Sequence, residues 1–106
     1  MGFKERDVVI VGAGPSALTA AIYLSREDVP TTLYERGVVG GMAAITDQID
    51  NYPGFAKGVT GMKLASELQQ QAERFGADIE YGDVTELKQV DGELELTIDG
   101  QPVRAK

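Results

Sequence analysis

The hydrophobic pattern alternates between strand-like and helix-like segments along most of the chain. Within the segment 7–11, residues 8–11 form an uninterrupted β-branched run, which is typical of a parallel strand buried on both faces. Residues 16–26 are rich in helix formers, and the side chains expected on their apolar face are Leu18, Ala21, Ile22 and Ser25. A second strand at 31–35, a second helix at about 61–75 and a third strand at 77–81 follow. This βαβαβ order predicts a parallel sheet with helical crossovers.

Both helices carry residues that favour their ends. Pro15 fits the first turn of the first helix because its missing N–H costs no hydrogen bond there, and 28–30 ends that helix. In the second helix, Thr60 is the expected N-cap and Gly76 the expected residue after the C-terminus. The apolar face of the second helix is expected to consist of Leu64, Ala65, Leu68, Ala72 and Phe75.

The last part of the chain follows a different pattern. Three short segments, 84–90, 93–98 and 101–105, are joined by the dipeptides Asp91-Gly92 and Asp99-Gly100, which are strong hairpin signals. The sequence therefore predicts an α/β fold with a Rossmann-like βαβαβ core in residues 1–83. A three-stranded antiparallel β-meander in residues 84–106 is attached to it.

A long connection at residues 37–61 separates the second strand from the second helix. It contains six glycines and few periodic apolar positions. A connection of this length in a small domain is usually functional, and the alternative is a mobile insertion. The Tyr52-Pro53-Gly54-Phe55 segment favours an ordered turn with apolar anchors.

The composition excludes several classes of function. The chain has no Cys and no His, which rules out disulfides, a thiol nucleophile and a histidine base, and we expect no metal. Ten Lys and Arg against 17 Asp and Glu give a net charge of −7, which disfavours nucleic acid and anionic membranes as partners. The longest apolar run, 20–24, is too short to span a membrane. With 106 residues there is room for one small domain, which we expect in the cytoplasm.

The most informative motif is the glycine fingerprint between the first strand and the first helix. Gly12 is expected to make the tight turn, and Gly14 lets a pyrophosphate approach the backbone. The N–H groups that open the helix at residues 15–17 are expected to face the phosphates. Glu35, 23 positions after Gly12 and at the end of the next strand, is expected to accept hydrogen bonds from a ribose.

A carboxylate at residue 35 disfavours a 2′-phosphate, so the fingerprint indicates FAD or NAD rather than NADP. The alternative is that the glycines serve only close packing of the helix on the strand and that Glu35 is solvated. The third position of the fingerprint is Ala17 rather than glycine.

Several longer motifs resemble one family. The segments 7–21, 34–37, Gly40-Gly41-Met42 and 49–55 resemble the start of bacterial thioredoxin reductases. They also resemble the thioredoxin-reductase-like ferredoxin/flavodoxin–NADP reductases. The resemblance runs from about residue 6 to the end. The Asn-Tyr-Pro-Gly-Phe block after a double glycine is more specific than the fingerprint alone.

The resemblance implies that the chain is the first part of a discontinuous FAD-binding domain. The resemblance implies that the pyrophosphate is bound by Gly12, Gly14, Pro15, Ser16 and Ala17. It implies that the adenosine is bound by Glu35 and Arg36, and that the adenine is contacted by Val84. It also implies that the ribityl chain or the flavin is contacted by Gly41 and Met42, and the isoalloxazine ring by Asn51. Four of these residues also have a purely structural interpretation. The Asn51 side chain could stabilise a local turn, and Arg36 could be a solvated charge. Met42 could fill the core, and Val84 could pack within the sheet. Family members usually carry Gln where this chain has Met42.

The resemblance also implies an activity. In the family, electrons pass from NADPH through FAD to a disulfide or to a redox protein such as thioredoxin, ferredoxin or flavodoxin. The NADPH domain and the redox Cys-x-x-Cys of the family are not in these 106 residues, and no residue of the chain is expected to be catalytic. The alternatives are an NAD-dependent dehydrogenase domain and a non-enzymatic nucleotide-binding module.

The chain alone is expected to be inactive and to bind FAD weakly at best. Its first strand is expected at the edge of the sheet without charges or prolines to protect it, so we expect a homodimer or other self-association.

Overall fold

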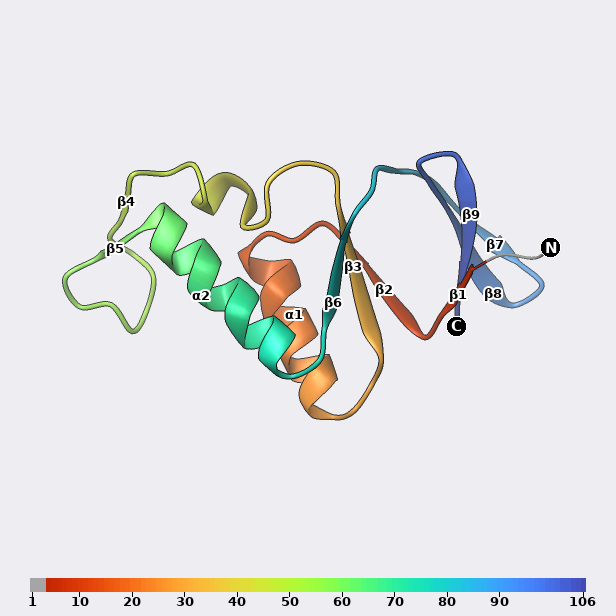
Figure 1. Cartoon of the computed structure of the whole chain (residues 1–106), viewed down its shortest axis with the longest axis horizontal. Helices are drawn as coiled ribbons and strands as arrows, with labels where there is room; N and C mark the ends of the chain where they lie inside the picture. Colours follow the sequence, from red (N-terminus) through yellow and green to blue (C-terminus); the bar gives the residue numbers. More distant parts are fainter. Residues whose placement is uncertain (1–3) are drawn as a thin grey trace.

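A three-stranded parallel sheet lies at the centre of the protein (Figure 1). The structure, a computed structural model, describes residues 4–106. The sheet has the order β2–β3–β6, formed by Val8–Val11, Thr31–Glu35 and Asp78–Tyr81. Both pairings are parallel, with Ile10 opposite Leu33 and Leu33 opposite Ile79. The predicted βαβαβ core is therefore confirmed.

The central strand is the best buried of the three. Residues 31–34 of β3 are all buried, because helices cover one face and the meander covers the other. β2 pairs only with β3 among the described residues, and its last residue, Val11, remains 57% exposed. The expected burial of this strand on both faces is thus reached only in part, because β2 lies at the edge of the sheet.

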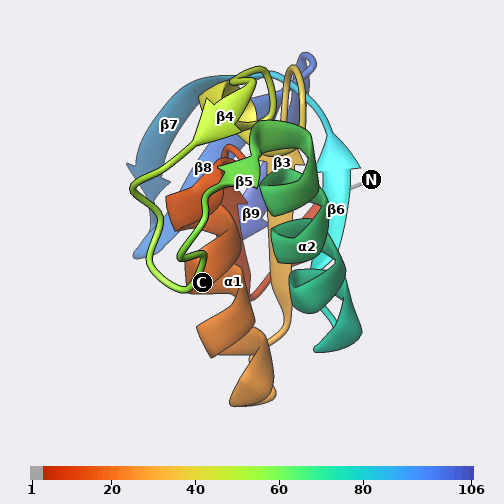
Figure 2. The ribbon, with the colours of Figure 1, turned by 90° about the vertical axis from the view of Figure 1, so that its left-hand side faces the viewer.

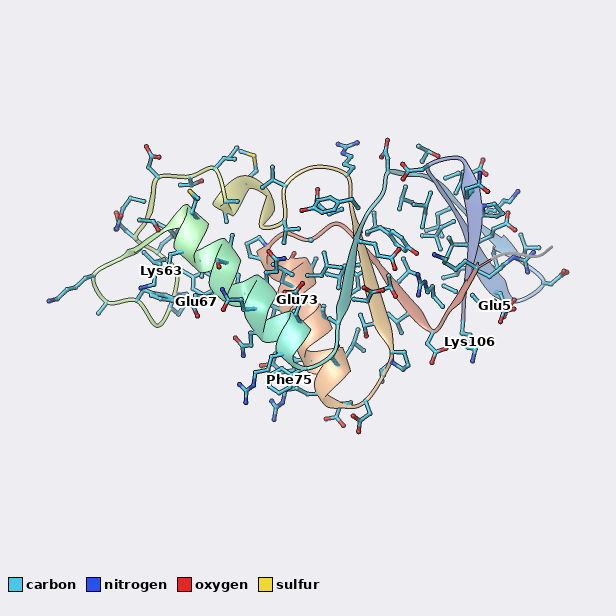
Figure 3. The ribbon with its side chains drawn as sticks, in the orientation of Figure 1. Glu5, Lys63, Glu67, Glu73, Phe75 and Lys106 are labelled. Carbon is cyan, nitrogen blue, oxygen red and sulfur yellow. The ribbon has the colours of Figure 1, made fainter. Side chains whose placement is uncertain are left out.

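Two helices cover one face of the parallel sheet, and they lie side by side in Figure 2. Helix α1, Pro15–Arg26, buries Leu18, Ala21, Ile22 and Ser25, as the periodicity predicts. Helix α2, Gly61–Arg74, buries Gly61, Leu64, Ala65, Leu68 and Ala72. Lys63, Glu67 and Glu73 lie along the exposed side of α2 (Figure 3).

The ends of α2 also follow the prediction. The Thr60 hydroxyl oxygen accepts a hydrogen bond from the Lys63 N–H at 3.2 Å. Gly76 follows the helix with a φ of 103°, a conformation that glycine adopts without strain. The guanidinium groups of Arg26 and Arg74 lie 5.7 and 4.9 Å from the centroid of the Phe75 ring, which thereby links the ends of the two helices.

A second sheet packs on the other face of β3. The strands β7, β8 and β9, Val84–Val90, Glu93–Ile98 and Gln101–Ala105, form the predicted antiparallel meander. A further strand, β1 (Lys4–Arg6), pairs in parallel with β9, so this sheet has the order β1–β9–β8–β7. The hydrophobic pattern does not predict β1, because its three charged residues show no apolar alternation.

The long connection between β3 and α2 is packed against the helical layer. It contains a 3₁₀ turn, η1 (Gly41–Ala43), and a two-residue strand pair, β4 (Gln48–Ile49) and β5 (Val59–Thr60). A side chain at Gly61 would collide with the carbonyl oxygens of Ala43 and Thr46. The close approach of the connection to α2 therefore depends on glycine at this position.

Candidate dinucleotide-binding site

The loops that follow β2, β3 and β6 meet at one edge of the parallel sheet, along the top of the molecule in Figure 1. Backbone hydrogen bonds join these loops. The Gly12 N–H donates to the Tyr34 carbonyl at 2.7 Å, and the Gly40 N–H donates to the Ala13 carbonyl at 2.7 Å. The Gly82 N–H donates to the Glu35 carbonyl at 2.9 Å. In open α/β sheets, ligands bind outside the carboxyl ends of the strands, and these loops occupy that place.

The two glycines of the fingerprint differ in what the fold requires of them. Gly12 has a φ of 99°, which a residue with a side chain rarely adopts, so the turn itself requires glycine. Gly14 has a φ of −79° and a ψ of −176°, which any residue can adopt. A Cβ built on Gly14 would meet no atom within 4 Å. Neither the backbone nor the packing therefore explains why residue 14 is a glycine.

The start of α1 lies next to this open space. Gly14 is the N-cap residue, no side chain caps the helix, and the first turn holds no acidic residue. The first helical hydrogen bond runs from the Leu18 N–H to the Gly14 carbonyl at 2.9 Å. The Ser16 and Ala17 N–H groups have no acceptor among residues 4–106. An uncapped helix start of this kind attracts an anion through its N–H groups and its dipole.

Glu35 has both of its carboxylate oxygens bonded to backbone. Oε1 accepts a hydrogen bond from the Ala13 N–H at 2.8 Å, and Oε2 accepts one from the Gly37 N–H at 2.8 Å. The alternative of a merely solvated Glu35 is therefore wrong, because this side chain holds the fingerprint turn against the end of β3. A carboxylate has about four acceptor positions, so Glu35 can still accept hydrogen bonds from a ligand.

A cavity of about 250 Å³ lies beside Glu35. Its walls come from the ends of all three parallel strands and from the start of the meander. They are formed by Val11, Gly12, Tyr34, Glu35, Arg36, Gly82, Asp83 and Val84. The structure thus brings Gly12, Glu35, Arg36 and Val84 together, as the resemblance implies. The Val84 side chain also packs against the meander core, as its structural interpretation requires, and its contact with adenine stays a prediction.

The remaining candidate residues lie further along the same edge. A Cβ on Gly41 would lie 3.4 Å from the Gly14 Cα, so the double-glycine loop adjoins the fingerprint. Met42 is 76% exposed, which overturns its interpretation as core packing. Asn51 is exposed in the 50–56 segment, which surrounds a separate hollow of about 530 Å³. No hydrogen bond among residues 4–106 supports the local turn considered for the Asn51 side chain.

Three residues of the cavity wall, Tyr34, Gly82 and Asp83, were not among the predicted site residues. Tyr34 looks like an ordinary strand residue, and Gly82-Asp83 looks like an ordinary turn between strands. The Tyr34 hydroxyl accepts a hydrogen bond from the Arg6 Nε at 3.3 Å, and Arg6 also pairs with Glu80 at 2.8 Å. Burial of the Arg6 guanidinium opposes its charge, but the hydrogen bond to Tyr34 and the nearby carboxylates raise the pKa of Arg6 overall.

These features define a class of protein. A parallel sheet with a glycine turn after its first strand, an uncapped helix start and an acidic residue at the end of the second strand forms a Rossmann-like nucleotide-binding unit. The chain belongs to the pyridine nucleotide-disulphide oxidoreductase family, whose model matches residues 6–101.

Within this family, the chain is similar to thioredoxin reductases. It is 44% identical over 89 residues to thioredoxin reductase of Bacillus subtilis (strain 168), covering 84% of this chain and 27% of that protein. It is 46% identical over 95 residues to thioredoxin reductase of Listeria monocytogenes, covering 90% of this chain and 29% of that protein. The crystal structure of Lactococcus lactis thioredoxin reductase matches with a TM-score of 0.89 at 35% identity, over 95% of this chain and 33% of that chain.

The chain therefore spans less than a third of the length of these curated relatives. No helix in residues 4–106 is long and apolar enough to cross a membrane.

Proposed function

We propose that this chain is the FAD-binding portion of a thioredoxin reductase-like flavoprotein oxidoreductase. In the complete activity, electrons pass from NADPH through FAD to a disulfide or a redox protein, and thioredoxin is the acceptor named for the relatives. The flavin supplies the redox chemistry when it is bound. The residues of this chain bind and orient it.

The observation that carries the proposal is the open space at Gly14. The fold does not need glycine there, yet a side chain would fill the space in front of the uncapped start of α1. A pyrophosphate in this space explains both features, because it accepts hydrogen bonds from the Ser16 and Ala17 N–H groups. Pro15 completes this first turn without an N–H of its own.

The other residues follow in order along the edge of the sheet. The cavity beside Glu35, Arg36 and Val84 takes the adenosine, and a carboxylate at residue 35 favours a ribose with free hydroxyls. Gly41 lies next to Gly14, and Gly41 and Met42 of the double-glycine loop contact the ribityl chain or the flavin under this proposal. Asn51, beyond the double-glycine loop, contacts the isoalloxazine ring.

The 106 residues alone are inactive under this proposal. They contain no Cys and no His, and none of the residues around the cavity is suited to transfer a hydride. The unprotected edge of β2 favours self-association of the chain, as a homodimer or a larger assembly. An acceptor protein would bind the complete oxidoreductase.

Titration of the purified chain with FAD, ADP, FMN and NADH tests the proposal. We expect weak, saturable binding of FAD that ADP displaces, since both ligands carry the adenosine and the pyrophosphate. FMN lacks the adenosine and should bind far more weakly. An NADH affinity above that of FAD would contradict the proposal in favour of an NAD-binding domain, and absence of ADP-sensitive binding at millimolar FAD would contradict it altogether.

A further inference from the structure

We propose that Asp99, in the turn between β8 and β9, is a positioning residue for the adenosine cavity. Its carboxylate holds the backbone of residues 82–84, which form one wall of that cavity. This inference rests on the proposed function, because it assigns the cavity to adenosine. It gives the meander a role in ligand binding that the fingerprint motif does not contain.

Two reciprocal hydrogen bonds connect the turn to the cavity wall. The Asp83 N–H donates to the Asp99 Oδ1 at 3.0 Å, and the Asp99 N–H donates to the Asp83 carbonyl at 3.1 Å. At its other end, the same wall is held by the hydrogen bond from the Gly82 N–H to the Glu35 carbonyl at 2.9 Å. The segment 82–84 is therefore fixed between the parallel sheet and the meander.

The close approach of the two segments requires a glycine in the wall. A Cβ on Gly82 would lie 2.7 Å from the Ile98 Cγ2 and 3.2 Å from the Tyr34 Cδ1. Ile98 immediately precedes Asp99, so the end of β8 packs directly on the wall. In Figure 1 the turn between β8 and β9 lies next to the connection from β6 to β7.

The other turn of the meander shows that a hairpin of this kind does not require a side-chain contact like that of Asp99. Asp91-Gly92, between β7 and β8, is the same dipeptide, and the φ values of Asp91 and Asp99 are 51° and 50°. Among residues 4–106, the Asp91 side chain makes no hydrogen bond to another element. The carboxylate of Asp99 thus has a contact that its counterpart lacks.

This geometry fixes the wall before a ligand arrives. The hydrogen bonds between Asp83 and Asp99 hold the backbone that leads into Val84 from within the protein itself. A ligand that meets a preorganised wall loses less free energy to the ordering of a loop. Loss of the Asp99 carboxylate should therefore weaken the binding of ligands that contain adenosine.

Three variants of the full 106-residue chain test this role. Asp99→Gly removes the carboxylate and tolerates the positive φ, so it deletes the hydrogen bond without adding backbone strain. Asp99→Asn keeps an acceptor oxygen and also tolerates this φ, so it should rescue the contact. Asp91→Gly makes the matched change in the other turn, and circular dichroism checks that all three variants fold.

The readouts are amide hydrogen exchange at Asp83 without ligand and the affinity for ADP. In Asp99→Gly we expect faster exchange at Asp83 and about three- to tenfold weaker ADP binding, the size of one net hydrogen bond. Asp99→Asn and Asp91→Gly should match the wild type in both measurements.

An Asp99→Gly variant with unchanged exchange and unchanged ADP affinity would overturn the inference. A failed rescue by Asp99→Asn would also overturn it, because the effect would then belong to the charge rather than to the hydrogen bond. If the wild type does not bind ADP, the proposed function fails and the ligand role of Asp99 fails with it. Exchange at Asp83 would still report whether the contact between the two segments exists.

Discussion

At the scale of single residues, the two glycines of the fingerprint occupy their positions for different physical reasons. Gly12 is required by its φ of 99°, whereas Gly14 has an ordinary φ and open space around it. We therefore expect glycine at residue 12 to be needed for the fold and glycine at residue 14 to be needed for ligand binding. This difference gives a paired test in which each variant is the control for the other.

We expect Gly14→Val to keep the helix content of the chain and to lose FAD binding, because the new side chain fills the pyrophosphate space. Gly12→Val should instead lower the free energy of unfolding by about 1–3 kcal/mol, the usual cost of a strained backbone position. Circular dichroism, urea unfolding and a flavin titration measure these effects. If Gly14→Val unfolds the protein, Gly14 is a folding residue.

Glu35 accepts hydrogen bonds from the backbone of Ala13 and Gly37, and we propose that it also binds the ribose of FAD. We expect Glu35→Ala to weaken FAD binding by about ten- to a hundredfold, since hydrogen bonds to a charged group contribute roughly 1.5–3 kcal/mol. It should also speed amide exchange at Ala13 and Gly37, which lose their acceptor. Glu35→Gln keeps one acceptor oxygen, so its FAD affinity and its amide exchange rates should lie between those of the wild type and of Glu35→Ala. A dissociation constant for FAD that does not change in Glu35→Ala would exclude the ribose contact.

Spacing alone predicted residues of the site only where one local motif contains them, whereas Arg36 and Val84 were predicted from the family resemblance. Gly12, Gly14 and Glu35 stand at fixed spacings around a strand, a turn and a helix, and the structure brings them together. Asp99 and Gly82 meet only because β8 packs against the β6–β7 connection. No periodicity or spacing in the sequence encodes that contact.

At the scale of elements, strong end signals made the prediction accurate. Helix α2 begins after Thr60 and ends before Gly76, and the meander strands end at the two Asp-Gly turns. The predicted and observed bounds of these elements therefore nearly coincide. β1, β4 and β5 were not predicted, because segments of two or three residues cannot show a period. Their pairing depends on tertiary neighbours.

The meander carries a cross-strand ion network that should make its stability depend on pH. Glu95 in β8 lies between Arg104 of β9, at 3.0 Å, and Lys88 of β7, at 3.6 Å. The hydrogen bond from Arg104 lowers the pKa of Glu95 below its ordinary value of 4.5, against the opposing effect of desolvation, and Lys88 lowers it further.

A depressed pKa in the folded state means that Glu95 stabilises the protein above pH 4.5 and loses this effect as the pH falls below that value. Glu95→Gln should therefore melt at a lower temperature than the wild type at neutral pH, and the difference should shrink below pH 4.5. Glu86→Gln, an exposed change on β7, is the control. A difference in melting temperature that does not vary with pH would contradict this account of the network.

At the scale of the whole molecule, the two sheets have differently protected edges. The edge strand β7 carries Glu86 and Lys88, which discourage pairing with another chain. The edge strand β2 consists only of Val and Ile, and Val11 at its end is 57% exposed. β2 is therefore the edge where we expect the chain to pair with a second copy.

We expect the isolated chain to elute from a size-exclusion column with a scattering mass above its 11.3 kDa. Val11→Lys places a charge on the β2 edge and should reduce the assembly. Leu87→Lys is the matched control, because Leu87 is 60% exposed on β7. A monodisperse wild-type monomer that holds FAD stoichiometrically through the column would contradict this expectation.

The central claim is that the adenosine and the pyrophosphate of FAD bind where the ends of the three parallel strands meet. Amide chemical-shift mapping with ADP on the ¹⁵N-labelled chain tests it most directly. We expect saturable shifts at Gly12, Gly14, Ser16 and Val84, with Ser25 and Gly76 at the opposite end of the helices unchanged. Shifts confined to the far end of the helices, or no saturable shift around Gly14, would contradict the account.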